Sequence, residues 1–425
     1  MGRGKVTALD VWQRADAAIA RREPVVKAFL HYDRSGSRAA AASPAAGPLG
    51  GAPLVVKDLA DVCGMPTTGG SRAYRRHPRR DAAVVGRWRD AGAVLLGKTN
   101  TEELAFGVIT APTTNPWDPA RIPGGSSGGT AAALAAGMAL GGLGTDTAGS
   151  IRIPAALCGV VGFKPTAGLL PLGGVMALAP SFDAVGPLAH SVDDAAALFH
   201  AMGGPAAAGA AARPRPPRIG LPDRYWSGRL DAEVSAAWQQ ALGVMERAGA
   251  QLSPLPWAPW ARWRDIFLAI RRPESFWVHR RMLASERRRL LRPGLAERLE
   301  EGGAVSAVDY IAAQAERASL IRAYRRRLGP LVVAMPTVGV VAPRAGEERL
   351  ALPQGSTSVW EALVALTMPA SVLGFPAVTV PMGWSRDRRL PIGLQIMGAP
   401  GRDLEVLAVA RWWVQHASPR SLPSQ

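Results

Sequence analysis

Two glycine-rich loops, each carrying serine, lie close together in this chain. They read Gly124-Gly125-Ser126-Ser127-Gly128-Gly129 and Gly144-Thr145-Asp146-Thr147-Ala148-Gly149-Ser150. Glycine at this density indicates backbone torsions or close approaches that a Cβ would forbid. Upstream, Lys57 follows the apolar run Leu54-Val55-Val56 and offers an amine as a base. Two hydroxyls and a lysine favour a hydrolytic site that needs no histidine, cysteine or metal.

The second loop has the features of a nucleophile site. Amide hydrolysis needs a nucleophile, a base and hydrogen-bond donors for the oxyanion. Ser150 ends a turn of small residues, in which successive backbone amides can converge on one point. Pro154 suits the first turn of a helix, so a helix is expected to begin close to Ser150. One predicted helix and one predicted strand separate Ser150 from Ser126, which can bring both loops to one sheet edge.

Lys57 is the candidate base because the apolar run before it predicts a buried strand. Desolvation lowers the pKa of a lysine and favours the neutral amine, to roughly 5–6 in extreme cases. All six histidines lie outside the glycine loops, so a Ser-His-Asp triad is poorly supported. A neutral Lys57 could accept a proton directly or through Ser126.

Each of these features also has a plainer interpretation. A strand-end lysine usually faces solvent, and glycine–serine runs occur in flexible linkers and phosphate loops. A linker is disfavoured because an apolar helix follows the first loop at once. A phosphate loop is disfavoured because Gly129 is followed by Thr130 and Ala131 instead of lysine and threonine. The combination of loops and lysine, not any one part, indicates catalysis.

The elements that must position these residues alternate between helical stretches and short apolar runs. Helices are predicted over residues 9–31, 81–91 and 130–139, and strands over 54–57, 93–97 and about 138–144. The strand pattern returns at 331–336 and 377–381. This alternation predicts an α/β core with a substantially parallel sheet.

The middle of the chain has a different composition. Residues 203–217 are rich in Ala, Pro and Gly and predict a surface linker. The long helical stretches that follow carry six tryptophans, most of which we expect to pack in the core, while some are candidates to wall a substrate cavity. They are Trp226, Trp238, Trp257, Trp260, Trp263 and Trp277. The substrate pocket is expected to be walled by residues 226–310 and 355–373.

The chain is strongly basic, with 50 Lys and Arg against 33 Asp and Glu and a formal net charge of +17. Such a field could attract an anionic partner. The arginine clusters lack interleaved aromatic residues and alternate with glutamates, as solvated helix faces do. A dedicated nucleic-acid partner is therefore not expected.

The N-terminal residues and the two cysteines indicate the cellular compartment and whether the protein associates with a membrane. Neither a signal peptide nor a membrane anchor is visible at the N-terminus. The two cysteines fit a reduced cytoplasm better than a disulfide, and Cys158 lies in an apolar setting that indicates packing. The protein is thus predicted to be cytoplasmic, with no membrane partner.

Beyond the two loops, further motifs make the chain resemble the amidase signature family. They occupy residues 53–58, 64–71, 97–103, 123–129, 144–155, 158–166, 374–377 and 390–395. Close matching covers roughly residues 48–200 and 365–405. The resemblance implies one α/β/α domain over residues 1–425, with a large mixed, mainly parallel twisted sheet covered by helices. The core would comprise about 48–200 and 330–410, and a divergent helical region would comprise 218–330.

The resemblance also implies a role for each loop residue. Ser150 corresponds to the acylated nucleophile, Ser126 to a bridging serine preceded by a cis peptide bond, and Lys57 to the base. The amides of Thr147, Ala148, Gly149 and Ser150 would form the oxyanion hole. Ser127, Asp146 and Arg152 match positions that support the loops. No cofactor and no metal are implied.

Two positions depart from the family pattern. Ala148 stands where many members have glycine, and Leu59 stands where many have asparagine. The extra methyl of Ala148 lies beside the expected acyl pocket and is a candidate determinant of selectivity. The three catalytic positions are intact.

These observations predict an amidohydrolase that cleaves a carboxamide in a small molecule, not a peptide bond, and releases ammonia or an amine. The same motifs resemble the glutaminase (A) component of tRNA-dependent amidotransferases, which works with partner subunits. A third alternative is a degenerate member kept as a binding protein, against which the intact Lys57, Ser126 and Ser150 count. The sequence leaves a homodimer open and does not identify the amide.

Overall fold

A single large sheet runs through the molecule. The computed structural model describes residues 6–206, 216–387 and 389–417. Its eleven-stranded sheet has the order β1-β3-β2-β4-β6-β5-β12-β13-β9-β7-β8, and β10 and β11 form a separate pair. The strands are β1 (Phe29–Tyr32), β2 (Pro53–Lys57), β3 (Val94–Thr99), β4 (Gly141–Asp146), β5 (Val161–Lys164), β6 (Ala184–Ala189), β7 (Arg218–Pro222), β8 (Gln251–Leu255), β9 (Val332–Pro336), β10 (Arg349–Leu352), β11 (Gly355–Ser358), β12 (Ala377–Trp384) and β13 (Pro391–Met397).

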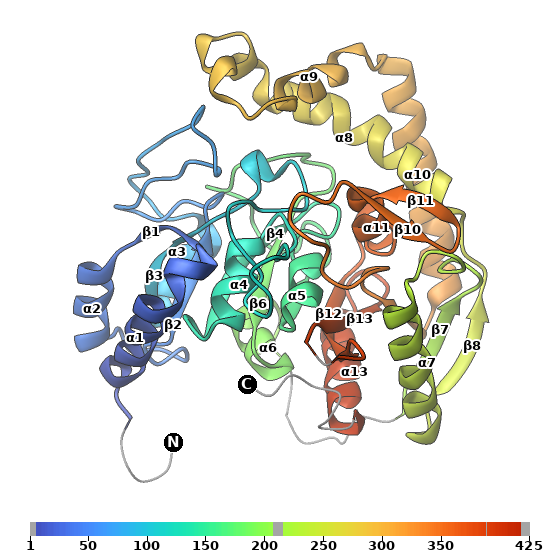
Figure 1. The fold of residues 1–425 in the computed structure, drawn as a ribbon, viewed down its shortest axis with the longest axis horizontal. Coiled ribbons are helices and arrows are strands. Elements are labelled where there is room, and N and C mark those ends of the chain that lie inside the picture. The colour runs from blue at the N-terminus through green and yellow to red at the C-terminus, as the bar shows by residue number, and fades with distance from the viewer. Residues whose placement is uncertain (1–5, 207–215, 388, 418–425) are drawn as a thin grey trace.

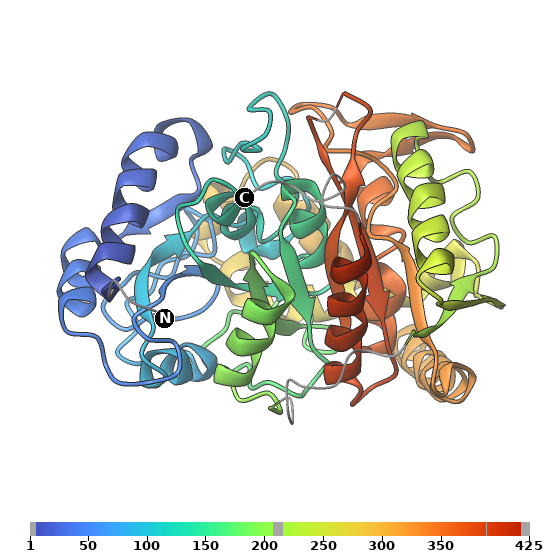
Figure 2. The same ribbon diagram turned by 90° about the horizontal axis from the view of Figure 1, so that it is seen from below.

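Helices flank the sheet, as Figures 1 and 2 show. Within the core, α5 packs on β12 and β13, and α6 packs on β6. The yellow and orange segment from α8 to α10 arches over one end of the molecule in Figure 1. The α-helices are α1 (Ala8–Val26), α2 (Arg34–Ala42), α3 (Ala83–Asp90), α4 (Gly128–Ala135), α5 (Arg152–Cys158), α6 (Val192–Ala201), α7 (Ala232–Arg247), α8 (Trp260–Leu283), α9 (Leu295–Glu300), α10 (Ala307–Leu328), α11 (Val359–Val364), α12 (Met368–Leu373) and α13 (Asp403–His416).

The predicted α/β class and large mixed sheet are confirmed, but the expected predominance of parallel pairing is wrong. Of the ten strand pairings in the described sheet, four are parallel and six are antiparallel. Parallel pairs join β3, β2 and β4 at one side and β9, β7 and β8 at the other. A short strand buried on both faces has the same apolar pattern in either direction, so the sequence did not reveal direction.

The predicted helices and strands exist, but the last part of the first predicted helix is a strand. The predicted helix over 9–31 ends at Val26, where Lys27 takes a left-handed conformation with φ of 53°. Residues 29–32 instead form β1, which pairs antiparallel with β3. Helical propensity favoured continuing the helix, but pairing with the edge of the sheet prevailed.

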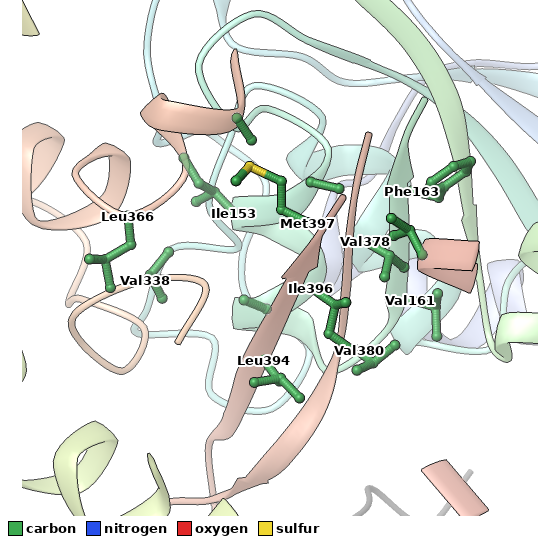
Figure 3. Close-up of a cluster of buried hydrophobic side chains, with 14 of the residues drawn as sticks. Ile153, Val161, Phe163, Val338, Leu366, Val378, Val380, Leu394, Ile396 and Met397 are labelled. Carbon is green, nitrogen blue, oxygen red and sulfur yellow. The ribbon is translucent and has the colours of Figure 1, made fainter. Parts of the chain in front are cut away.

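The hydrophobic core surrounds the central strands. Figure 3 shows Val378 and Val380 of β12 beside Leu394 and Ile396 of β13, and Ile153 of α5 near the end of β13. All of these side chains are at most 2% exposed. The start of α5, which follows the second glycine loop, is thus anchored in the core.

The tryptophans of the middle region behave largely as predicted. Trp238, Trp260 and Trp263 are buried, and Trp226 and Trp257 pack against the core. Trp277 is the exception because it is 58% exposed. Of the predicted linker over 203–217, residues 207–215 lie outside the described residues. No helix in the described part of the chain is long and apolar enough to span a membrane.

Candidate active site

Lys57 is the centre of a buried cluster of hydroxyls. It is the last residue of β2, a strand whose five residues are all buried. Its Nζ donates to Ser126 Oγ at 2.7 Å, Ser127 Oγ at 2.9 Å and Thr145 Oγ1 at 2.8 Å. No carboxylate of a described residue contacts the amine. Burial lowers the pKa of Lys57 to about 7, partly opposed by more distant carboxylates, so a large share of the amine is neutral at neutral pH.

The hydrogen bonds of this cluster indicate which hydroxyl can give a proton to Lys57. A neutral amine has two N–H donors and one lone pair, so one of its three partners must donate to it. Ser127 Oγ is directed to the carbonyl of Thr145 at 3.2 Å and is thereby committed as a donor. The proton must therefore come from Ser126 or Thr145. Thr145 was not identified from the sequence, although it lies within the second glycine loop.

The first glycine loop fixes Ser126 rigidly. The Gly125–Ser126 peptide bond is cis, as the resemblance implies. The Ser126 carbonyl accepts from the Glu102 amide at 3.1 Å and from Thr101 Oγ1 at 3.0 Å. Gly125 has no room for a side chain, because a Cβ there would lie 2.8 Å from the backbone of Val108. The loop is held between neighbouring segments, so its glycines provide close packing.

Ser150 lies in the turn between β4 and α5 and faces a cavity. It is 6% exposed and lines a cavity of about 520 Å³. Its carbonyl accepts from the Ser127 amide at 3.1 Å, which ties the two glycine loops together. The Ser150 hydroxyl makes no hydrogen bond with any described residue. The structure therefore joins Lys57 to Ser126 but leaves the Ser150 hydroxyl unattached.

The turn before Ser150 presents free backbone donors. Of the four amides that the resemblance assigns to the oxyanion hole, those of Thr147, Ala148 and Ser150 have no acceptor among the described residues. The Gly149 amide instead donates to Asp146 Oδ1 at 2.8 Å. Three of the four amides are thus available to a ligand in this conformation.

A threonine far along the chain holds the same turn in shape. Thr367 Oγ1 donates to the Ala148 carbonyl at 2.6 Å. Gly149 has a φ of 132°, and a Cβ on it would lie 2.3 Å from Thr367 Oγ1. Glycine is therefore required at this position for both reasons. Sequence reasoning missed Thr367, because no local motif marks a contact across more than 200 residues.

Asp146 and Arg152 form a buried pair beneath the turn. Arg152 Nη2 lies 2.8 Å from Asp146 Oδ1, and Nε lies 3.0 Å from Oδ2. The remaining Arg152 donors reach the Thr367 carbonyl, Gln395 Oε1 and Ser371 Oγ. Burial alone would raise the pKa of Asp146, but Arg152 holds it below its usual range. Arg152 has no donor left for a substrate and does not line the cavity.

Asp183, a carboxylate that was not predicted from the sequence, supports Thr147. Thr147 Oγ1 donates to Asp183 Oδ1 at 2.6 Å, and the Leu178 and Ala179 amides donate to Oδ2. Burial raises the pKa of Asp183 to about 6. This carboxylate orients the residue that carries one of the free amides.

The cavity is walled by the regions that the sequence indicated. Seven of the lining residues fall between 267 and 301, from α8 to the residue after α9, and four fall between 358 and 364, along α11. A third wall, residues 102–109, was not predicted. Ala148 lines the cavity, as expected of a residue beside the acyl pocket. None of the six predicted packing tryptophans lines it; Trp360 does.

No cysteine or histidine side chain of the described residues lines this cavity. Cys158 is buried, and burial raises the pKa of its thiol, in agreement with a packing role. None of the six histidines lines the cavity. No group of three or more His, Cys, Asp or Glu side chains in the described ranges could hold a metal ion.

Comparison with known proteins gives consistent matches along most of the chain. The Amidase family model matches residues 13–407. An amidase of Pseudomonas putida is 36% identical, covering 96% of this chain and 91% of that protein. The A component of the glutamyl-tRNA(Gln) amidotransferase of Solidesulfovibrio magneticus is 33% identical, covering 97% of this chain and 94% of that protein. A crystal structure of an amidase superposes with a TM-score of 0.91 at 34% identity, covering 97% of both chains.

Proposed function

The chain belongs to the amidase family, a family of hydrolases, and from this we propose that it hydrolyses a carboxamide through an acyl-enzyme on Ser150. The observation that carries the proposal is the Lys57–Ser126 contact of 2.7 Å beside a serine that faces a cavity. A buried amine whose pKa is lowered to about 7 is suited to accept a proton at neutral pH. The substrate is a small-molecule amide that fits the cavity.

In the proposed reaction, protons pass along three side chains. Neutral Lys57 takes the proton of Ser126, Ser126 takes that of Ser150, and Ser150 Oγ attacks the carbonyl carbon. The tetrahedral intermediate collapses, the C–N bond breaks, and the leaving nitrogen receives the proton back. Water then attacks the ester by the same route and restores the serine.

This relay requires a hydrogen bond between the Ser126 and Ser150 hydroxyls. None is present in the free protein, and catalytic hydrogen bonds often tighten only when substrate is bound. A rotation of the Ser150 side chain towards Ser126 as the amide enters would complete the path. The developing oxyanion would then be received by the free amides of Thr147, Ala148 and Ser150. Ser127, Asp146 and Arg152 support this arrangement without touching the substrate.

The test is ammonia release from a panel of amides by the wild type and by Ser150→Ala. We expect Ser150→Ala to reduce kcat/KM by roughly a thousandfold or more while the protein remains folded. Ser253→Ala, in the remote strand β8, is a matched control that should retain full activity. Activity retained by a folded Ser150→Ala variant would refute the proposed nucleophile.

A second candidate function is the glutaminase component of an amidotransferase, favoured by the 33% identity to the glutamyl-tRNA(Gln) amidotransferase of Solidesulfovibrio magneticus. In that case the ammonia from glutamine would pass to a partner protein. Affinity purification of the tagged chain from its own cells separates the candidates. Co-purified partners with glutaminase activity would favour the second function, and a solitary chain that hydrolyses simple amides would favour the first.

A further inference from the structure

A cation without a carboxylate partner among the described residues lines the cavity that holds Ser150. Arg271 stands on α8, and its guanidinium makes no hydrogen bond and no ion pair with any residue in the described ranges. Its Nε is buried. A guanidinium carries five N–H donors, and burying a charged group without a partner is unfavourable. Arg271 therefore has unused binding capacity towards the cavity.

The other charged residues around the cavity do not supply the missing partner. Arg272 pairs with Glu301 at 3.2 Å, and Arg292 pairs with Glu102 at 3.2 Å. Glu347 and Glu348 also line the cavity but are exposed to solvent, as is Arg298. None of these carboxylates lies within 4 Å of Arg271.

Arg271 makes a cation–π contact with an aromatic ring. Its Cζ lies 4.5 Å from the centroid of Phe106, and Arg298 Cζ lies 5.7 Å from the same centroid. A ring face attracts a cation more weakly than a carboxylate does, so this contact leaves the charge largely uncompensated. Burial, with repulsion from Arg272 and Arg298, lowers the pKa of Arg271 to about 10, and the more distant Glu301 opposes this only in part. The ring lies against the guanidinium, whose two terminal nitrogens make no hydrogen bond with a described residue.

We propose that Arg271 binds a carboxylate of the substrate, and that the amides hydrolysed at Ser150 are monoamides of dicarboxylic acids. The proposal rests on the proposed function of Ser150. Arg271 and Ser150 line one cavity, whose volume of about 520 Å³ is ample for such a molecule. Ile153, Leu178 and Val364 also line it and suit a methylene chain between the two polar ends. A guanidinium recognises a carboxylate by two parallel hydrogen bonds.

The experiment compares an acidic amide with its neutral counterpart. Ammonia release is measured from succinamate, glutaramate and adipamate and from the corresponding diamides, which replace the carboxylate with a group of similar shape. The wild type should prefer at least one monoamide over its diamide. Arg271→Gln should lower kcat/KM for that monoamide about ten- to hundredfold, mainly through KM, and should collapse the preference. Arg271→Lys should restore part of it.

Arg298→Gln is the matched control, because Arg298 faces the same ring but is exposed to solvent. It should change the preference less than about threefold, since exposed charges are screened. If Arg298→Gln lost as much of the preference for the monoamide as Arg271→Gln, the assignment to Arg271 would be overturned. A wild type that hydrolyses diamides and monoamides equally would also overturn it, a result that leaves the proposed amidase function standing.

A binding measurement separates this inference from catalysis. Glutarate, which carries no amide, should raise the Tm of the wild type and of Ser150→Ala but not of Arg271→Gln. Arg271→Gln should itself be no less stable than the wild type, because it removes an uncompensated charge. If glutarate still raised the Tm of Arg271→Gln, the assignment of the carboxylate site to Arg271 would be overturned. If the wild type bound glutarate but hydrolysed none of the amides, only the proposed function would be overturned.

Discussion

Replacing Thr145 by valine offers a direct test of how the fold prepares Lys57 as a base. The hydroxyl of Thr145 accepts a 2.8 Å hydrogen bond from Lys57 Nζ and has no other hydrogen bond among the described residues. Valine has the same shape but no hydroxyl. The protonated amine has three N–H donors, so it would lose one of its three partners. The neutral amine can turn its lone pair towards the new methyl group and keep its two N–H donors bonded to Ser126 and Ser127.

The change therefore penalises the charged form more than the neutral form, because an unsatisfied charged N–H is more costly than an unsatisfied lone pair. An unsatisfied buried donor costs about 1–3 kcal/mol, and about 1.36 kcal/mol corresponds to a tenfold change in the proton equilibrium. Starting from a pKa of about 7, we expect the pKa of Lys57 in Thr145→Val to fall by about one pH unit. Since the base must be neutral, activity rises with pH through this pKa. At about pH 6 the wild type should show about a tenth of its plateau activity, and the variant about half of its own plateau.

The assay is the pH dependence of kcat/KM between about pH 4.5 and 9, which reports the free enzyme. Thr145→Ser keeps the hydroxyl and should keep the wild-type inflection near pH 7. The plateau of Thr145→Val is expected to fall somewhat, because the lone pair must turn back towards Ser126 for catalysis; the diagnostic quantity is the position of the inflection. An inflection that does not move to lower pH in Thr145→Val would refute the hydroxyl cluster as a determinant of the Lys57 pKa.

Two further predictions concern the turn around Ser150. Thr367→Val removes the 2.6 Å hydrogen bond to the Ala148 carbonyl; kcat should fall about tenfold with little change in KM, because the loosened turn presents its amides less well to the transition state. Equal changes in kcat and KM, seen by steady-state kinetics, would contradict this. Arg152→Met leaves Asp146 as an unpaired buried charge and should lower the free energy of unfolding by about 3–5 kcal/mol. Urea denaturation measures this, and a loss below about 1 kcal/mol would show that the pair contributes little.

The fold was predictable in its parts and less so in its assembly. Runs such as residues 54–57 and 377–381 are apolar enough to be recognised as buried strands, and both lie within observed strands. Their directions depend on partners that are distant in the chain. β12, for example, pairs antiparallel with both β5 and β13. The extent of α1 was overestimated for a related reason, because the pairing of residues 29–32 with β3 is a long-range interaction that local propensity does not contain.

The sequence by itself determined the loops that carry Ser126 and Ser150 and the strand that ends at Lys57. Close packing and a positive φ require glycine, and such requirements are visible in short strings of residues. Only the tertiary structure decided that Lys57 meets three hydroxyls and no carboxylate of the described residues. It also decided that Thr367 fixes the turn, and that Arg271 lines the cavity without a carboxylate partner in the described ranges. The first two sets of contacts join residues that are 69 to 219 positions apart. Sheet order and helix packing set such distances, and a pKa or an unpaired charge depends on the whole environment that they create.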